Sequence, residues 1–341
     1  MTEHDRQKNL PFLLKPAGKD YLWGGNRLND DFSKDIPMEP LAETWECSTH
    51  PDGPSIVNSG EYKGMLLTDL LHQHPDFLGT HPRNVLSVCN LRDDELPILI
   101  KFIDAKQDLS IQVHPDDEYA YNHENGQLGK TEMWYVLDAT KDAHLIYGLV
   151  HDMDKQSLKK AIAAGNLEKY LQKVSIKKDD VFNVKAGTIH AIGAGALIAE
   201  IQESSNLTYR LYDYNRVDKN GKQRELHIDK AIEVADLKAS SEPAQPMRVL
   251  KYSRGCANEF LYRCKYFQVE RLLLNTERIR EMLTIATDAK SFMVLLCVDG
   301  CGLLYCGNES IPFFKGDCIF IPADSVPMQL HGTAQFLKVN C

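Results

Sequence analysis

Short apolar runs separated by turn residues recur along this chain, and they restrict it to a β-rich fold. The runs are rich in Val, Ile, Leu and aromatic residues and are bounded by Gly, Asp, Asn or Pro, which is the pattern of strands joined by tight connections. They predict strands at residues 98–105, 109–115, 133–139, 144–150, 180–186, 196–204 and 207–215. So many short strands favour a β-sandwich or barrel, and a jelly-roll-like architecture fits them.

A few segments have helical rather than strand periodicity. Residues 154–174 place Leu158, Ile162, Leu167 and Leu171 near helical spacing, with Gly165 between two short helices. This segment predicts a helical insertion over about 151–175. Residues 65–79 and 227–239 also predict helices, whereas residues 41–48 alternate like a strand.

The polar, proline-containing segment 239–246 marks a domain boundary. We therefore expect a first domain over residues 1–240, which includes the helical insertion, and a second β-domain over residues 247–341. The first domain carries the candidate site described below.

The second half of the chain repeats part of the first. Residues 178–191 align without a gap to residues 315–328, and residues 136–139 align to residues 297–300. This alignment sets two candidate ligands of the first half against residues of other types: Glu132 against Met293, and His190 against Pro327. We expect the second β-domain to bind no metal.

Charge and hydropathy narrow the classes of partner. The 39 basic and 48 acidic side chains give a net charge of −9, which disfavours nucleic acid and anionic membranes as partners. An anionic substrate therefore needs a locally basic pocket. The first residues lack the apolar core of a signal peptide, and no stretch approaches the roughly 20 apolar residues of a membrane span, so we expect a soluble, cytoplasmic protein.

Two clusters of potential metal ligands have simpler explanations. The nine cysteines are expected to be reduced, and the four that lie close together lack any CxxC pair, so we predict buried strand thiols at Cys297, Cys301, Cys306 and Cys318. Three histidines lie near a helix end without a carboxylate at ligand spacing. We predict solvated surface residues at His72, His74 and His81.

Four other residues predict one metal site. Strand alternation sends Gln112 and His114 to the same face, Glu132 begins a further strand, and His190 follows an Ala-Gly-Thr turn. Two imidazoles and a carboxylate suit Zn²⁺ and also accept Fe²⁺, Mn²⁺ or Co²⁺. Zinc is our first choice.

The segments that carry these residues also resemble a known family. FIDAKQDLSIQVHPDDEYA, GKTEMWYVL, AGTIHAIGAG and AEIQESSNLTYRLYDYNR, together with YLWGG and AETWECSTHPDG, are similar to the short, bacterial-type class I mannose-6-phosphate isomerases of the cupin superfamily. The common cupin pattern has His-x-His and Pro-x-Gly-x-x-His. Here Gln112 replaces the first His, as is typical of this isomerase family, and the second part of the pattern keeps Gly187 and His190 but has no Pro.

The resemblance implies a fold, a cofactor and a reaction. The fold would be mainly β, with two cupin-type jelly-roll domains, a helical insertion and a few extra helices. One zinc ion per chain would be held by Gln112, His114, Glu132 and His190. The substrate would be a small sugar phosphate, interconverted between mannose 6-phosphate and fructose 6-phosphate, and no obligate protein partner is evident.

Isomerisation moves a proton between C1 and C2 through an enediolate, so the site needs a base and positive charge beside the oxygens. The candidates are Lys130, Glu200 and Arg210. Arg210 would stabilise the enediolate or be a surface strand arginine. Glu200 would contact substrate and handle protons, or form a structural ion pair, and Lys130 would orient hydroxyls or shuttle protons, or be an exposed turn residue.

A phosphate group needs fixed cations and hydroxyl donors. Ser110 shares strand parity with Gln112, and the resemblance points to Lys101 and Arg216 as the basic partners. Glu43, with Trp45 on the same strand face, is a weaker substrate-side candidate, although a core role explains Trp45 equally well.

Two other functions remain as alternatives. One is a sugar-phosphate-binding cupin that has lost catalysis, since a fold does not establish an activity. The other is a cupin oxygenase that uses Fe²⁺. The glutamine ligand and the segment from Glu200 to Arg210 argue against the oxygenase, and retention of Lys130, Glu200 and Arg210 disfavours the inactive protein.

Overall fold

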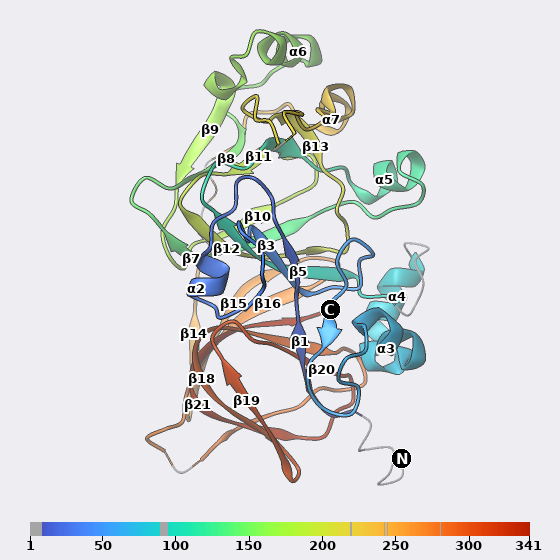
Figure 1. Ribbon diagram of the computed structural model, residues 1–341, viewed down its shortest axis with the longest axis vertical. Helices are drawn as coiled ribbons and strands as arrows, with labels where there is room; N and C mark the ends of the chain where they lie inside the picture. The colour runs from blue at the N-terminus through green and yellow to red at the C-terminus, as the bar shows by residue number, and fades with distance from the viewer. Residues whose placement is uncertain (1–8, 89–94, 219, 242, 244, 280) are drawn as a thin grey trace.

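Three antiparallel sheets succeed one another along the long axis of the molecule (Figure 1). The computed structural model describes residues 9–88, 95–218, 220–241, 243, 245–279 and 281–341. A six-stranded sheet lies between a five-stranded sheet and a ten-stranded sheet, and helices cover the free face of the five-stranded sheet.

The six-stranded and five-stranded sheets form a sandwich. Trp134 and Ile103 from the first sheet pack against Leu145 and Ile192 from the second, in one buried cluster. The six-stranded sheet has the order β10-β7-β12-β5-β3-β2. Its strands are β2 (Ala17–Lys19), β3 (Glu43–Cys47), β5 (Ile98–Ala105), β7 (Glu132–Ala139), β10 (Val181–Val184) and β12 (Ala196–Glu203).

The five-stranded sheet has the order β13-β6-β11-β8-β9. Its strands are β6 (Ile111–Val113), β8 (His144–Leu149), β9 (Leu171–Ser175), β11 (His190–Ile192) and β13 (Tyr209–Tyr212). Each of the seven segments with strand-like patterning between residues 98 and 215 therefore contains an observed strand.

The ten-stranded sheet combines the C-terminal part of the chain with two strands from its beginning. Its strands are β1 (Phe12–Lys15), β4 (Ile56–Val57), β14 (Leu250–Ser253), β15 (Cys256–Arg263), β16 (Gln268–Asn275), β17 (Leu283–Ile285), β18 (Met293–Cys306), β19 (Glu309–Phe314), β20 (Cys318–Ile321) and β21 (Met328–Asn340). Strand β1 pairs with β20, so that Phe12 lies opposite Phe320. The boundary near residue 240 stays a prediction, but residues 12–15 and 56–57 lie in the sheet of the C-terminal part, not with the first sandwich.

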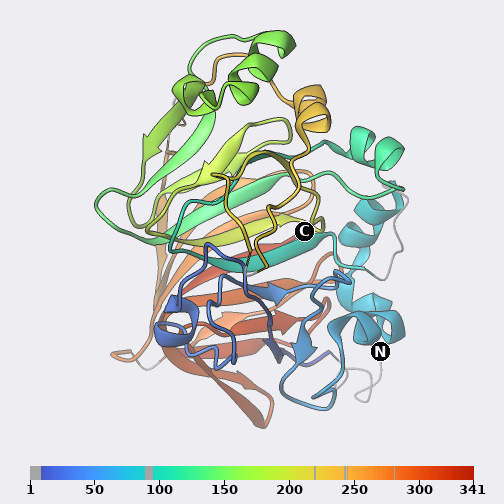
Figure 2. The same cartoon turned by 45° about the horizontal axis from the view of Figure 1, so that its top comes forward.

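The helices are short and lie outside the sheets (Figure 2). They are α2 (Arg27–Asp30), α3 (Leu67–Gln73), η1 (Pro75–Leu78), α4 (Thr80–Val88), α5 (Asp117–His123), α6 (Lys155–Ala163), η2 (Leu167–Tyr170) and α7 (Ile228–Val234). Asp154 caps α6 by accepting a hydrogen bond from the Ser157 backbone N–H at 2.8 Å. None of the helices in the described ranges has the length and apolar character that crossing a membrane requires.

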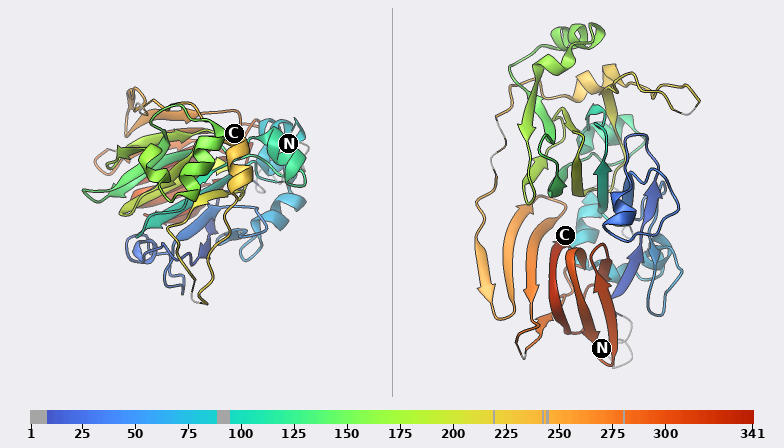
Figure 3. Two further views of the ribbon diagram at one scale, coloured as in Figure 1. Left: turned by 90° about the horizontal axis from the view of Figure 1, so that it is seen from above. Right: turned by 60° about the vertical axis from the view of Figure 1, so that its left-hand side comes forward.

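Buried side chains separate these layers into four cores. Leu158 of α6 and Ile232 of α7 pack on Ile111 of the five-stranded sheet. The next cluster fills the sandwich, a third joins the six-stranded sheet to the ten-stranded sheet, and the fourth lies within the ten-stranded sheet. Figure 3 shows that the orange and red C-terminal strands and the green α6 helix lie at opposite ends of the molecule.

Strand register confirms the internal repeat. Glu132 of β7 lies opposite Val184 of β10, and Met293 of β18 lies opposite Ile321 of β20. The alignment of residues 178–191 with residues 315–328 matches Val184 to Ile321, and the alignment of residues 136–139 with residues 297–300 sets Glu132 against Met293. The two halves therefore share the same strand pairing, with Met293 at the place of Glu132.

The helical insertion is shorter than predicted. Residues 155–163 and 167–170 are helical, but Leu171–Ser175 form β9, which pairs with β8. Leu171 and Val174 are buried, and this spacing looks helical in sequence. Pairing with β8, which satisfies the backbone groups of the segment, overrides the local pattern.

The thiol and histidine predictions hold with one exception each. Cys297, Cys306 and Cys318 are buried, whereas Cys301 is exposed. A register shift between Cys297 and Asp299 reverses the strand alternation, so the prediction for Cys301 was wrong. His72 and His81 are exposed, but His74 is half-buried and stacks on Phe77 with ring centroids 4.9 Å apart.

Two glycines of the YLWGG segment lie very close to neighbouring parts of the chain. A Cβ atom on Gly24 would lie 2.4 Å from the Ala42 Cβ, and one on Gly25 would lie 2.2 Å from Asp104 Oδ2. A side chain on Gly24 would meet the Ala42 backbone, and one on Gly25 would displace the Asp104 carboxylate. The glycines therefore allow this segment to lie against β3 and β5, which brings Tyr21 and Trp23 to the pocket described next.

Candidate metal centre and its pocket

A row of side chains crosses the six-stranded sheet on the face toward the sandwich interior. Direct cross-strand partners are Trp45 with Lys101, Lys101 with Glu200, and Glu200 with Trp134. Partners directly opposite each other project from the same face of a sheet. Four strands, β3, β5, β12 and β7, thus contribute one polar and aromatic row.

A second row crosses the five-stranded sheet. Gln112 of β6 lies opposite His190 of β11 on one side and opposite Arg210 of β13 on the other. Members of both rows line one pocket, including Lys101 and Glu200 from the first row and Gln112 and Arg210 from the second. The sandwich therefore holds the predicted residues between its two sheets.

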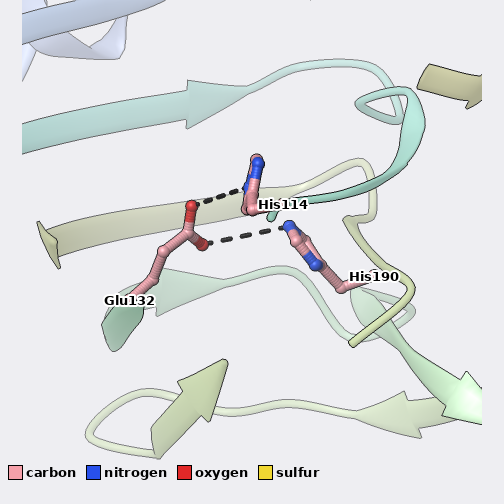
Figure 4. Close-up of side chains that lie close together, drawn as sticks. All are labelled: His114, Glu132 and His190. Atoms are coloured by element: carbon pink, nitrogen blue, oxygen red, sulfur yellow. Dashed lines mark ion pairs between the residues drawn. The ribbon is translucent and has the colours of Figure 1, made fainter. Parts of the chain in front are cut away.

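Three of the four predicted metal ligands meet at the centre of this arrangement (Figure 4). His114 Nε2 lies 3.0 Å from Glu132 Oε1, and His190 Nε2 lies 3.9 Å from Glu132 Oε2. One donor atom from each of these residues lies within 4.8 Å of the others. All three side chains are buried, with no more than 1% of their surface exposed.

Hydrogen bonds from the far side of each ring orient both imidazoles. His114 Nδ1 lies 2.7 Å from the Leu207 carbonyl oxygen, and His190 Nδ1 lies 2.8 Å from the Thr188 carbonyl oxygen. A carbonyl only accepts, so each Nδ1 carries the proton and each Nε2 presents its lone pair to the centre. Backbone oxygens hold metal-binding histidines in this way.

The protonation states of the three residues also suit a cation. Burial and the nearby Lys130 lower the pKa of His114 to about 3, and burial lowers the pKa of His190. Burial opposes ionisation of Glu132, but the Lys130 ammonium holds the pKa of that carboxyl well below its ordinary value. Among the described residues, neither His114 Nε2 nor Glu132 Oε2 has a hydrogen-bond partner, whereas Glu132 Oε1 lies next to the Lys130 ammonium. Such orphaned lone pairs are costly unless a cation satisfies them.

Gln112, the fourth predicted ligand, lies at the edge of this group. Its amide Nε2 is 3.4 Å from His190 Nε2, and its Oε1 accepts a hydrogen bond from the Ser110 hydroxyl at 3.3 Å. A half-turn of the amide would place the oxygen toward His190 and a metal. The nearly equal shapes of the amide oxygen and nitrogen make this rotation sterically easy.

Glu200 and Lys130 lie directly beside the metal centre. Lys130 Nζ is 2.6 Å from Glu132 Oε1 and 3.7 Å from Glu200 Oε1, while Lys101 Nζ lies 3.4 Å from the same Glu200 oxygen. Trp134 Nε1 donates to Glu200 Oε2 at 2.8 Å. Burial and the charge of Glu132 raise the pKa of Glu200. Lys130 is only 4% exposed, which excludes the alternative of a solvated turn lysine.

Not all of the predicted substrate- and phosphate-binding residues line the pocket. Lys101 and Ser110 line the pocket, as does Glu43, which accepts a hydrogen bond from Trp45 Nε1 at 2.8 Å. Arg216 does not line it.

Several residues that line the pocket were not predicted from the sequence as site residues: Tyr21, Trp23, Trp134, Asn206, Thr208 and Arg224. Trp134 could have been found by parity, because it lies two residues after Glu132 on the same strand. Tyr21 and Trp23 belong to the YLWGG segment, whose place in the fold no periodicity reveals. Arg224 lies between β13 and α7 in a segment without strand or helix patterning.

A buried carboxyl group supports the turn that precedes Glu132. Glu203 Oε1 accepts a hydrogen bond from the Thr131 backbone N–H at 2.7 Å. Burial and the nearby Asp117 raise the pKa of Glu203 to about 8. At neutral pH the neutral form of Glu203 therefore predominates, and this carboxyl adds little negative charge behind the metal centre.

The sequence of this chain matches two protein-family models, and it matches several known proteins along nearly its whole length. The family model for "Phosphomannose isomerase type I, catalytic domain" matches residues 11–144, and the one for "Mannose-6-phosphate isomerase, cupin domain" matches residues 257–341. The mannose-6-phosphate isomerase ManA of Bacillus subtilis is 39% identical over 95% of this chain and 97% of its own length. The mannose-6-phosphate isomerase of Streptococcus mutans is 35% identical over 96% of this chain and 97% of its own.

Solved structures give the same picture at the level of the fold. The crystal structure of the mannose 6-phosphate isomerase from Bacillus subtilis superposes with a TM-score of 0.85 at 36% identity and covers 97% of this chain and 99% of that one. A zinc-bound mannose 6-phosphate isomerase has a TM-score of 0.71 at 17% identity and covers 96% of this chain and 98% of that one. At that identity the likeness concerns the fold alone.

Proposed function

Because this chain belongs to the type I phosphomannose isomerase family, we propose that it interconverts mannose 6-phosphate and fructose 6-phosphate in the pocket between the two sheets of the sandwich. The observation that carries the proposal is the meeting of two kinds of group in one buried place. A set of neutral imidazoles and a carboxylate lies directly beside a lysine, a second carboxyl and an arginine.

The donor set fits one divalent cation, held by His114, His190, Glu132 and the amide oxygen of Gln112. Nitrogen and oxygen donors in this proportion suit zinc, which we propose as the resident ion, one per chain. A bound cation would supply fixed positive charge beside the sugar oxygens and act as a Lewis acid.

The proton transfer falls to Glu200 and Lys130 in this proposal. An enediolate pathway requires a group that takes a proton from one carbon and returns it to the next. The pKa of Glu200, which burial and the charge of Glu132 raise, moves toward the range where a carboxyl exchanges protons near neutral pH. Lys130, between Glu132 and Glu200, would orient a sugar hydroxyl or pass a proton to it.

Arg210 supports the same step through its charge. Burial and the charge of Arg224 lower its pKa, but an arginine remains charged at neutral pH and so stabilises negative charge on the sugar oxygens. The pocket-lining residues Lys101, Ser110 and Glu43 would position the substrate.

A coupled assay with mannose 6-phosphate tests the proposal. The metal-replete protein should turn over the substrate, a chelator should abolish turnover, and added zinc should restore it under anaerobic conditions. Tight binding without turnover in the metal-replete protein would instead support a binding protein. Activity that required oxygen and Fe²⁺ would support the oxygenase alternative.

A further inference from the structure

Three arginines and one aspartate form a cluster at one side of the pocket. Arg210 and Arg224 line the pocket, and Arg216 and Asp213 lie next to them. Three positive charges and one negative charge leave the cluster a formal charge of about +2. The two lysines of the pocket, Lys101 and Lys130, differ because their charges are offset. Within ion-pair distance of them lie three buried carboxyl groups: Glu43, Glu132 and Glu200.

Arg224 is fixed in position and keeps donors available. Its Nε and Nη2 atoms donate to the two carboxylate oxygens of Asp213 at 2.7 and 2.5 Å. Burial opposes ionisation of Asp213, but hydrogen bonds from Arg224 and Arg216 lower its pKa and keep it charged. A guanidinium has five N–H donors, so this fork leaves Nη1 and one hydrogen of Nη2 for another ligand. The side chain is 27% exposed and can reach a ligand in the pocket.

Arg216 is engaged differently, although it binds the same aspartate. Its Nη1 donates to the Asp108 carbonyl oxygen at 2.6 Å, its Nη2 to Asp213 Oδ1 at 2.5 Å, and its Nε to the Asp213 carbonyl oxygen at 3.3 Å. Every nitrogen of this guanidinium thus has a partner in the protein. Arg216 therefore helps to hold Asp213 in place, and it does not line the pocket.

Arg210 shows that the cluster is electrostatically incomplete. Its Nε atom is buried and has no hydrogen-bond partner in the part of the chain that the structure describes. Burial is the largest cause that lowers the pKa of Arg210, and the like charge of Arg224 is the next, which outweighs the opposite effect of Asp213. An anion at this side of the pocket would offset the repulsion between the two guanidiniums.

We propose that Arg224 binds the phosphate group of the substrate, in the place that sequence similarity assigns to Arg216. This inference rests on the proposed function, since it concerns the sugar phosphate bound in the same pocket. A phosphate monoester carries about −1.5 to −2 charges at neutral pH, which matches the charge of the cluster. Pairs of arginine N–H groups bind phosphate oxygens with good geometry, and Asp213 leaves Nη1 and one hydrogen of Nη2 available as such a pair.

The test compares Arg224→Ala with Arg216→Ala and with Arg224→Lys. Binding of a hexitol 6-phosphate, which has the phosphate but no carbonyl to isomerise, is measured by calorimetry on the zinc-loaded proteins. Loss of charge-assisted hydrogen bonds to phosphate should weaken binding to Arg224→Ala by roughly 10- to 100-fold. Arg224→Lys should recover part of this loss, since it restores the charge but not the fork. Arg216→Ala should weaken binding less.

Kinetics on mannose 6-phosphate give the second measurement. Arg224→Ala should raise KM by a similar factor and leave kcat within about threefold of the wild-type value, because the interaction is present equally in the ground and transition states. Arg254→Ala, at an exposed surface ion pair with Glu281, controls for the loss of an arginine as such and should leave both constants unchanged.

The outcomes separate this inference from the proposed function. An active wild type whose hexitol 6-phosphate affinity is the same in Arg224→Ala, or falls more in Arg216→Ala, overturns the role of Arg224 and leaves the isomerase intact. A wild type without isomerase activity overturns the proposed function, while calorimetry still tests phosphate binding. If Arg224→Ala unfolds, Arg224→Lys and Arg224→Gln decide: wild-type affinity in both variants contradicts a contact between Arg224 and the phosphate, and a larger loss in Arg224→Gln than in Arg224→Lys supports it.

Discussion

Acidification should weaken metal binding far less than it does at a site made of ordinary histidines. The metal-free protein is brought to pH 7.5 or to pH 5.5 and is then titrated with zinc. Metal binds the neutral form of each imidazole, so protons compete with zinc whenever a free histidine is charged. The size of the pH effect therefore reports the pKa values of the empty site.

The structure sets the size of this effect. A histidine with the ordinary pKa of about 6.5 loses roughly tenfold of its neutral fraction between these two pH values, so two such ligands would cost about 100-fold in affinity. Burial and Lys130 lower the pKa of His114 to about 3, so His114 stays neutral throughout. Even if His190 had its ordinary pKa the loss would be about tenfold, and burial lowers that pKa as well. We therefore expect a loss of less than about tenfold.

Competition with a chromophoric chelator of known pH dependence measures the affinity at each pH. Circular dichroism at both pH values checks that the protein remains folded. A loss near 100-fold would show that both rings take up protons freely in the empty site, so that burial and Lys130 do not keep them neutral.

Four substitutions test other parts of the structure. His190→Ala should lose zinc and turnover together, whereas Arg210→Ala should keep zinc and lose turnover; metal analysis beside the coupled assay checks both, and an active, zinc-free His190→Ala protein would refute the site. Glu203 has a folded-state pKa of about 8, above its unfolded value, so its contribution to stability is complete at low pH and is lost as the pH rises through 8. Glu203→Gln should flatten this dependence in urea unfolding between pH 6 and pH 9, and an unchanged slope would contradict it. Gly24→Ala places a Cβ atom 2.4 Å from the Ala42 Cβ and should lower the unfolding free energy by about 1–3 kcal/mol; an unchanged melting temperature would argue against the close approach.

Local patterning predicted the strands of the sandwich well, because they are short, mostly apolar runs bounded by turn residues, and β5 and β12 are buried along their whole length. The runs at residues 98–105 and 196–204 correspond to β5 and β12, and the relation between the two halves is confirmed by strand register. The family and the mainly β, cupin-type fold are confirmed by the comparisons. Pairings between distant parts of the chain were not predictable in this way: β9 looked helical, and nothing in the sequence indicated that β1 would join the C-terminal strands.

The site residues that lie on strands could be predicted from the alternation of side chains along a strand. Those that lie on loops could not. His114, Glu132 and His190 come together as the spacing and the resemblance implied. Trp134 was within reach of the same parity argument, two residues beyond Glu132. Arg224 was not, because its place depends on hydrogen bonds to Asp213 that form only in the folded chain.

The pairing of β1 with β20 also bears on how the chain folds during synthesis. Phe12 lies opposite Phe320, and their rings stack with centroids 5.2 Å apart. The first strand can therefore reach its partner only when nearly all of the chain has left the ribosome. Until then its apolar side chains and one of its backbone edges stay uncovered, and contacts so distant in sequence form slowly. A truncated chain that lacks β20 would leave β1 unpaired and exposed. Chaperones and proteases could recognise incomplete chains by binding this strand.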